Sequence, residues 1–144
     1  MAQVSHTTDN FTSRAILFSG IEVKPENGDQ KEAELQMAIW MAASLRKKMD
    51  LARTPLFKVI VSQFGVGNRT PLIPAPTALL EPALTIIGHE HKVYYAYPSS
   101  EENGNITILG PDEKLADLST RSVEGIFKLI RLYGSILNYG SHVE

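Results

Sequence analysis

The sequence predicts one α/β domain of the α+β type, in which helices flank a mixed sheet of four to five strands. The order of its segments carries this prediction: a strand-like segment and a long helix come first, short β-rich segments follow, and an apolar helix closes the chain. The 144 residues, of which 43% are hydrophobic, suit one domain with a sizeable core. We therefore expect a single domain over residues 13–140 and a disordered tail over residues 1–12.

The first strand is expected within residues 15–24. Ile21, Glu22, Val23 and Lys24 alternate apolar with charged side chains. Because successive side chains of a strand point to opposite faces, Glu22 and Lys24 should share one face. We expect Ile21 and Val23 to point the other way, into the core. The turn residues that follow should end the strand.

A long helix should follow, from Asp29 to about Met49. Asp29 and Glu32 have the spacing of a capping box, in which Asp29 accepts from a first-turn amide and Glu32 reaches back to it. Apolar residues at helical spacing predict the face that packs against the sheet. These residues are Leu35, Ala38, Ile39, Ala42, Leu45 and Met49.

Residues 56–64 read as a buried strand, and residues 65–82 as a long loop because they hold four of the eight prolines. Such a loop could serve as a lid, a binding loop or an oligomer contact, or it could be a poorly ordered insertion.

Three antiparallel strands are expected over residues 83–87, 93–97 and 105–109, with turn signals between them. A closing helix should begin near Thr120. Its apolar residues fall on one face, and they are Val123, Ile126, Phe127, Ile130, Gly134 and Leu137.

Composition excludes several classes of site and partner. The net charge of −2 disfavours tight binding to nucleic acid through its phosphates. The absence of cysteine excludes disulfides, thiolate metal sites and cysteine nucleophiles. The N-terminal residues lack the apolar core of a signal peptide, and no stretch approaches the ~20 apolar residues of a membrane span. We therefore expect a cytoplasmic or nuclear protein with no membrane contact.

Glu22 and Lys24 are the strongest candidates for chemistry. On a strand their backbone positions lie about 6–7 Å apart on one face. The carboxylate can hold a hard cation such as Mg²⁺, and the lysine can stabilise an attacking water or a developing phosphate charge. Gln36 and Trp40 lie one turn apart on the helix that follows. Alternating charges on an exposed strand face are also common, so the pair alone does not decide the function.

Two longer segments and four shorter ones form a recognisable series: SRAILFSGIEVK at residues 13–24, KEAELQMAIWMAA at residues 31–43, and pieces at residues 86–90, 93–95, 106–110 and 119–122. In this order they resemble the fungal PD-(D/E)XK nuclease-like domain family. The resemblance implies a restriction-endonuclease-like core in which Glu22 and Lys24 match the (D/E)XK half of the motif. It also implies that Gln36 and Glu34 match polar helix positions bordering the site.

The sequence departs from this family before residue 13. Full-length members carry a further strand and helix there, including the first aspartate of the motif, so the resemblance implies a core shortened at its N-terminus. Asp9 is the only aspartate before Glu22. It is either a replacement metal ligand or a solvated tail residue. The usual metal site with two carboxylates therefore looks incomplete.

Histidines and tyrosines give weaker signals. His89 and His91 flank Glu90 and could share a metal, but we favour their interpretation as exposed polar residues at a hairpin tip. Tyr94 and Tyr95 could stack on bases or line an apolar pocket, but aromatic residues in strands most often belong to the core.

Three functions follow from these observations. In the first, the cleft beside Glu22 and Lys24 is re-used for small-molecule binding or for acid/base catalysis in a biosynthetic pathway, and no cofactor is required. The catalytic residues are then Glu22, Lys24 and Gln36. The binding residues are Glu34 and Trp40. In the second, a Mg²⁺-dependent nuclease uses Glu22 as metal ligand. In the third, the chain is a non-catalytic interaction protein. We favour the first, and we expect a homodimer because an uncovered sheet edge or apolar face should recruit a second copy.

Overall fold

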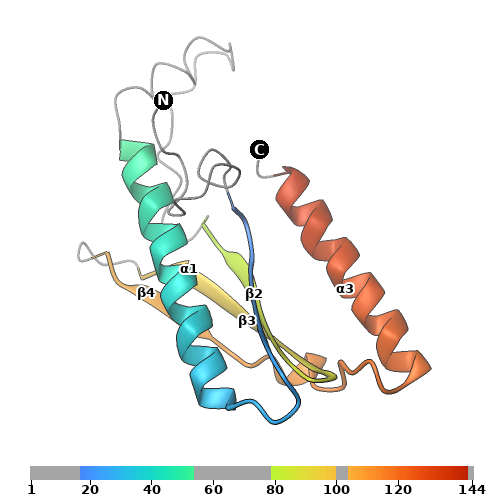
Figure 1. Ribbon diagram of the computed structural model, residues 1–144. Coiled ribbons are helices and arrows are strands. Elements are labelled where there is room, and N and C mark those ends of the chain that lie inside the picture. Colours follow the sequence, from blue (N-terminus) through green and yellow to red (C-terminus); the bar gives the residue numbers. More distant parts are fainter. Residues whose placement is uncertain (1–16, 54–78, 100–103, 143–144) are drawn as a thin grey trace, which may run out of the picture. The chain divides into compact units, whose positions relative to one another are not determined.

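The structure is a computed structural model that describes residues 17–53, 79–99 and 104–142 (Figure 1). The expected strand over residues 56–64, the expected tail and most of the expected loop lie outside these residues. The described elements are β1 (Gly20–Lys24), α1 (Gln30–Arg53), β2 (Glu81–Ile87), β3 (Glu90–Pro98), β4 (Ile106–Leu109), the short 3₁₀ helix η3 (Glu113–Leu115) and α3 (Val123–His142). No helix in these parts of the chain is long and apolar enough to cross a membrane.

The four strands form one mixed sheet in the order β1-β2-β3-β4. Strand β1 runs parallel to β2 and places Glu22 beside Thr85, whereas β2 runs antiparallel to β3. A tight turn joins β2 to β3, and Gly88 adopts a positive φ of 57° there, which residues with a side chain rarely adopt. The mixed sheet with two helices confirms the expected α+β class.

Contacts divide the described residues into two compact units. The larger comprises Phe18–Met41, Glu81–Ala96 and 108–142, and it contains every residue of the candidate site. The smaller comprises Leu17 and residues 42–53, 79–80, 97–99 and 104–107. Within the smaller unit, Ser99 N donates to Asn105 O, and Ser99 Oγ lies 2.7 Å from Thr107 Oγ1, so the end of β3 is joined to β4. The prediction of a single domain stays a prediction.

Within the larger unit, α3 covers one face of the sheet. Leu84 of β2 and Val93 of β3 form a buried cluster with Leu118 and with Leu129 and Ile136 of α3. Strand neighbours of these residues point the opposite way.

The first half of α1 covers that opposite face. Tyr94, the neighbour of Val93, donates its hydroxyl to Glu34 of α1. The sheet therefore has a helix on each face, as expected.

The expected buried face of α1 is wrong in part, although Leu45 is buried as expected. Leu35 and Ile39 expose 61% and 60% of their surface, whereas Ala33, Met37 and Met41 are buried. Apolar residues surround most of this helix, so their spacing allows more than one stripe. Close packing selects the buried one: a Cβ on Gly20 would lie 2.7 Å from Met41 Sδ.

The expected burial on β1 is also wrong. Ile21 and Val23 expose 51% and 63% of their surface, whereas the charged residues Glu22 and Lys24 are less exposed. Strand β1 lies at the edge of the described sheet. The cluster under α3 takes its sheet residues from β2 and β3, so Ile21 and Val23 are not part of it.

Candidate functional site

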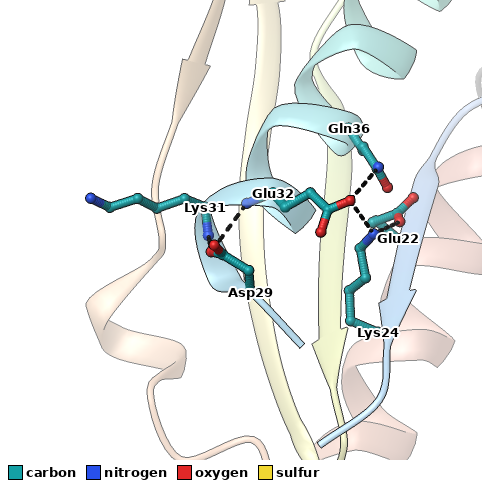
Figure 2. Close-up of polar contacts among 6 residues, drawn as sticks. All are labelled: Glu22, Lys24, Asp29, Lys31, Glu32 and Gln36. Atoms are coloured by element: carbon teal, nitrogen blue, oxygen red, sulfur yellow. Dashed lines mark hydrogen bonds and ion pairs between the residues drawn. The ribbon is translucent and has the colours of Figure 1, made fainter. Parts of the chain in front are cut away.

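Glu22 and Lys24 project from the same face of β1, as their spacing predicted (Figure 2). Lys24 Nζ lies 3.7 Å from Glu22 Oε1, and the two side chains expose only 16% and 21% of their surface. The face that carries them is the one toward α1, because Lys24 also contacts that helix. A charged pair this well covered can be oriented more firmly than a solvated pair on an open strand.

Glu32 of α1 completes the contact. Its Oε1 lies 3.1 Å from Lys24 Nζ and accepts a hydrogen bond of 3.0 Å from Gln36 Nε2. Gln36 is thus brought to the site, as the sequence predicted, although it contacts Glu32 rather than Glu22. Glu22, Lys24, Glu32 and Gln36 are called the Lys24 cluster below.

The start of α1 positions Glu32. Asp29 Oδ1 accepts from Lys31 N at 2.7 Å and from Glu32 N at 3.4 Å, so Asp29 caps the helix as expected. The reciprocal half of the expected capping box is wrong, because the Glu32 side chain turns toward Lys24 and Gln36 (Figure 2). The Glu32 carboxylate contacts Lys24 instead of the backbone amide because an ammonium attracts a carboxylate more strongly than a neutral amide does.

The electrostatics of the Lys24 cluster are simple. One ammonium lies between two carboxylates, so the cluster carries a formal charge of −1 when all three groups are ionised. Glu32 remains half exposed, at 54%, and can be reached from solvent. The cluster can accept hydrogen bonds through its carboxylate oxygens and can offer the lysine as a source of positive charge.

The arrangement of the Lys24 cluster does not suit the binding of a divalent metal ion. Mg²⁺ is held by carboxylate oxygens in an octahedral shell. Within residues 17–53, 79–99 and 104–142, no group of three His, Cys, Asp or Glu side chains could hold a metal ion. Glu22 and Glu32 are two carboxylates, and Lys24 lies between them. We therefore derive no chemical step through a metal.

Comparison with known proteins identifies the family. The model of the PD-(D/E)XK nuclease superfamily matches residues 1–143. The chain belongs to this superfamily. No curated protein and no solved structure matches it. The mixed four-stranded sheet with two helices is consistent with the restriction-endonuclease-like fold of PD-(D/E)XK proteins.

Glu34, expected beside Gln36 at the border of the site, makes a separate set of contacts. Its Oε1 accepts 2.7 Å hydrogen bonds from Tyr94 Oη and from Gln30 Nε2. Tyr94 is 3% exposed. Burial, and after it the hydrogen bond to Glu34, raise the pKa of Tyr94 to about 12. Glu34 therefore joins α1 to β3.

Trp40, the other expected binding residue, lies one helical turn beyond Gln36 and exposes 52% of its surface. It is not one of the four residues of the Lys24 cluster. Its expected part in ligand binding stays a prediction, as do the catalytic roles of Glu22, Lys24 and Gln36.

His89 of the β2–β3 turn and His91 of β3 have different partners. His89 Nδ1 lies 2.7 Å from Thr120 Oγ1 and is exposed, whereas His91 Nδ1 lies 3.1 Å from Tyr133 Oη and is buried. Burial lowers the pKa of His91 although Glu90 raises it. These contacts explain the histidines as structural residues of the hairpin and its neighbours.

Sequence reasoning missed Glu32 as a site residue. Its position three residues after Asp29 was sufficient to assign it to the helix cap. The sequence feature that could have indicated a role for Glu32 in the site is the presence of acidic residues in the first turns of α1, shortly after a strand that carries Lys24.

Proposed function

We propose that the Lys24 cluster binds a small polar molecule and acts on it by acid/base chemistry in a biosynthetic pathway, and that the chain is not an efficient nuclease. The proposal rests on one observation above all. Lys24, the residue that would meet a phosphate, is held at 3.1 Å by Glu32 and at 3.7 Å by Glu22.

This geometry disfavours a polyphosphate substrate. A phosphodiester that approached Lys24 would compete with two carboxylates that already compensate its charge, and both would repel the phosphate. The chain as a whole has a net charge of −2, which gives little counterion-release drive toward nucleic acid. The local and the overall charge therefore point in the same direction.

The same geometry suits acid/base chemistry on a molecule with hydrogen-bond donors, such as an amine or an alcohol. Glu22 is a carboxylate that can accept a proton from the bound donor. Lys24 can then stabilise the negative charge that develops on the substrate. Gln36 holds Glu32 through a 3.0 Å hydrogen bond and so keeps the second carboxylate in place. This proposal requires no cofactor.

A metal-dependent nuclease is the second candidate, because the chain belongs to the PD-(D/E)XK nuclease superfamily and places Glu22 and Lys24 on one face. In that function Glu22 and Glu32 would hold Mg²⁺, and Lys24 would face the phosphate. The ion would need further ligands beyond these two carboxylates.

Cleavage assays separate the two functions. Purified protein is incubated with single- and double-stranded DNA and RNA in Mg²⁺ or Mn²⁺, beside the variants Glu22→Gln and Lys24→Met. We expect no cleavage that depends on either residue. Turnover that both variants abolish, and that the control Lys31→Met retains, would establish the nuclease instead. Lys31 is a suitable control because it extends away from the cluster (Figure 2).

Ligand screening tests the preferred function directly. Thermal shifts are measured with panels of small amines, alcohols, carboxylates and phosphates. We expect stabilisation by a donor-bearing compound that is lost in Glu22→Gln and Lys24→Met and retained in Lys31→Met. Binding that survives both cluster substitutions would place the ligand elsewhere.

A further inference from the structure

Helix α3 carries an exposed apolar stripe. Val123, Ile130 and Leu137 recur at intervals of seven residues, and Ile126 and Phe127 lie between the first two. At ~100° per residue, helical geometry places all five within one stripe. They expose between 41% (Ile126) and 72% (Val123) of their surface. These five residues are called the α3 stripe.

The α3 stripe differs from the face by which α3 joins the core. Leu129 and Ile136, at 4% and 8% exposed, pack into the cluster with β2 and β3. A third side is polar, where Lys128 Nζ lies 2.9 Å from Glu124 Oε1. A helix that only covers a sheet needs one apolar face. The second apolar face therefore indicates a further contact.

Gly134 lies on the same side of the helix as the α3 stripe. Among the residues that the structure describes, a Cβ at this position would meet nothing within 4 Å, so none of them requires a glycine here. Glycine inside a helix costs about 1 kcal/mol relative to alanine. A glycine at position 134 is explained if another backbone or side chain approaches the helix closely there. Phe127, with 62% of its surface exposed, offers a side chain of the size that such a gap accepts.

We propose that the α3 stripe is the interface of a homodimer, in which α3 of a second copy docks antiparallel about a twofold axis near Ile130. This arrangement places Val123 opposite Leu137 of the second copy. It also places Phe127 over Gly134 of the second copy. The same contacts occur twice, as a twofold interface requires. Each ring then occupies the gap left by the partner's glycine, as a knob occupies a hole.

The exposed area is sufficient for two copies. Each side chain of the α3 stripe exposes roughly 100 Å², which gives on the order of 500 Å² per copy and about 1,000 Å² for the pair. Specific interfaces begin near ~1,000 Å² in total. The α3 stripe contains no charged residue, so its burial leaves no unpaired charge. Because interface area alone does not fix affinity, the mass must be measured over a range of protein concentrations.

Light scattering after size exclusion, over a series from low to high micromolar concentration, tests the proposal. We expect the mass to rise from 15.9 kDa toward twice that value. A monomer throughout the series overturns the proposal, whether the α3 stripe is then covered by other residues of the chain or by a different protein.

Two variants test the surface. Phe127→Glu buries a charge in the interface and should give a monomer at every concentration. Gly134→Leu fills the gap and should also give a monomer, while its higher helix propensity raises the melting temperature. Ser135→Glu adds the same charge on the polar side and should leave the dimer intact. A dimer that persists in both stripe variants overturns the proposal, and Gly134→Leu decides alone if Phe127→Glu does not fold.

Discussion

Lys24 Nζ lies closer to Glu32 Oε1 on α1, at 3.1 Å, than to Glu22 Oε1 on its own strand, at 3.7 Å. The shorter contact joins two elements of the larger unit. It therefore fixes the start of α1 against the edge strand and places a second carboxylate beside Lys24. The Lys24 cluster thus contains three charged groups rather than two.

The first prediction concerns the energy of this contact. Lys24→Met should lower the free energy of unfolding by on the order of 0.5–1 kcal/mol, because the lysine loses partly exposed ion pairs. In double-mutant cycles it should couple more strongly with Glu32→Gln than with Glu22→Gln, in line with the two distances. Urea unfolding measures both couplings. Lys31→Met is the control and should change stability little. Stronger coupling with Glu22 would contradict the geometry.

The second prediction concerns the helix cap. Asp29→Ala should destabilise the protein by about 1 kcal/mol, because Lys31 N and Glu32 N lose their acceptor at the positive end of the helix dipole. Asp29→Asn retains an acceptor and should cost much less. Chemical denaturation of the three proteins gives the comparison. Equal stability of the alanine and asparagine variants would show that the cap contributes nothing measurable.

Sequence periodicity was sufficient to predict β1 and the shared face of its charged residues, but not which face is covered. The alternation of Ile21, Glu22, Val23 and Lys24 is the same whichever side faces a helix. Coverage depends on residues distant in sequence: α1 contacts the charged side, and the cluster under α3 is built from β2 and β3. Burial on an edge strand is thus a tertiary property.

Glu32 illustrates the corresponding limit for the candidate site. Spacing relative to Asp29 correctly located the start of α1. It could not predict the direction of the Glu32 side chain, because two partners compete for the carboxylate. The backbone amide near Asp29 is local, whereas Lys24 becomes a neighbour only when α1 packs on β1. Local sequence motifs therefore do not predict an ion pair whose charged partner comes from another element.

The third prediction is a spectroscopic titration of Tyr94. Its pKa of about 12, raised by burial and by the hydrogen bond to Glu34, should appear as the difference between the alkaline absorbance titrations of the wild type and Tyr94→Phe. Because this folded-state pKa exceeds the unfolded value near ~10, the contribution of Tyr94 to stability is complete below pH ~10 and is lost as the pH rises toward 12. A difference titrating near pH ~10 would place Tyr94 in solvent.

The fourth prediction concerns stability in mild acid. Burial lowers the pKa of His91, so the unfolded chain binds the proton more readily than the folded chain does. Stability should therefore rise with pH, and the contribution of His91 should be lost as the pH falls through the unfolded value of about 6.5 toward the lower folded value. His91→Phe should flatten this part of the stability profile. His89→Phe is the control, and an equal effect of both substitutions would contradict a specific role of His91.

The fifth prediction compares two glycines of α3. Within the described parts of the chain, a Cβ on Gly134 would meet nothing within 4 Å, whereas a Cβ on Gly140 would lie 2.6 Å from ring atoms of Phe18. Gly134→Ala should therefore stabilise the protein by roughly 0.5–1 kcal/mol, because alanine is the better helix former and meets no obstacle. Gly140→Ala should destabilise it by about 1–3 kcal/mol, because the ring of Phe18, which packs against the core cluster, must move.

The two substitutions should change the free energy of unfolding in opposite directions. Because the chemical change is the same and both sites lie in one helix, this comparison separates the effect of helix propensity from the effect of packing. Thermal and urea unfolding at low protein concentration, where assembly does not contribute, measure the two effects. Stabilisation by both substitutions would show that Phe18 yields to the added methyl group, and the position of Phe18 against α3 would then be wrong. Destabilisation by Gly134→Ala would show that the space beside Gly134 is filled in the monomer, which would also remove the gap on which the docking of Phe127 depends.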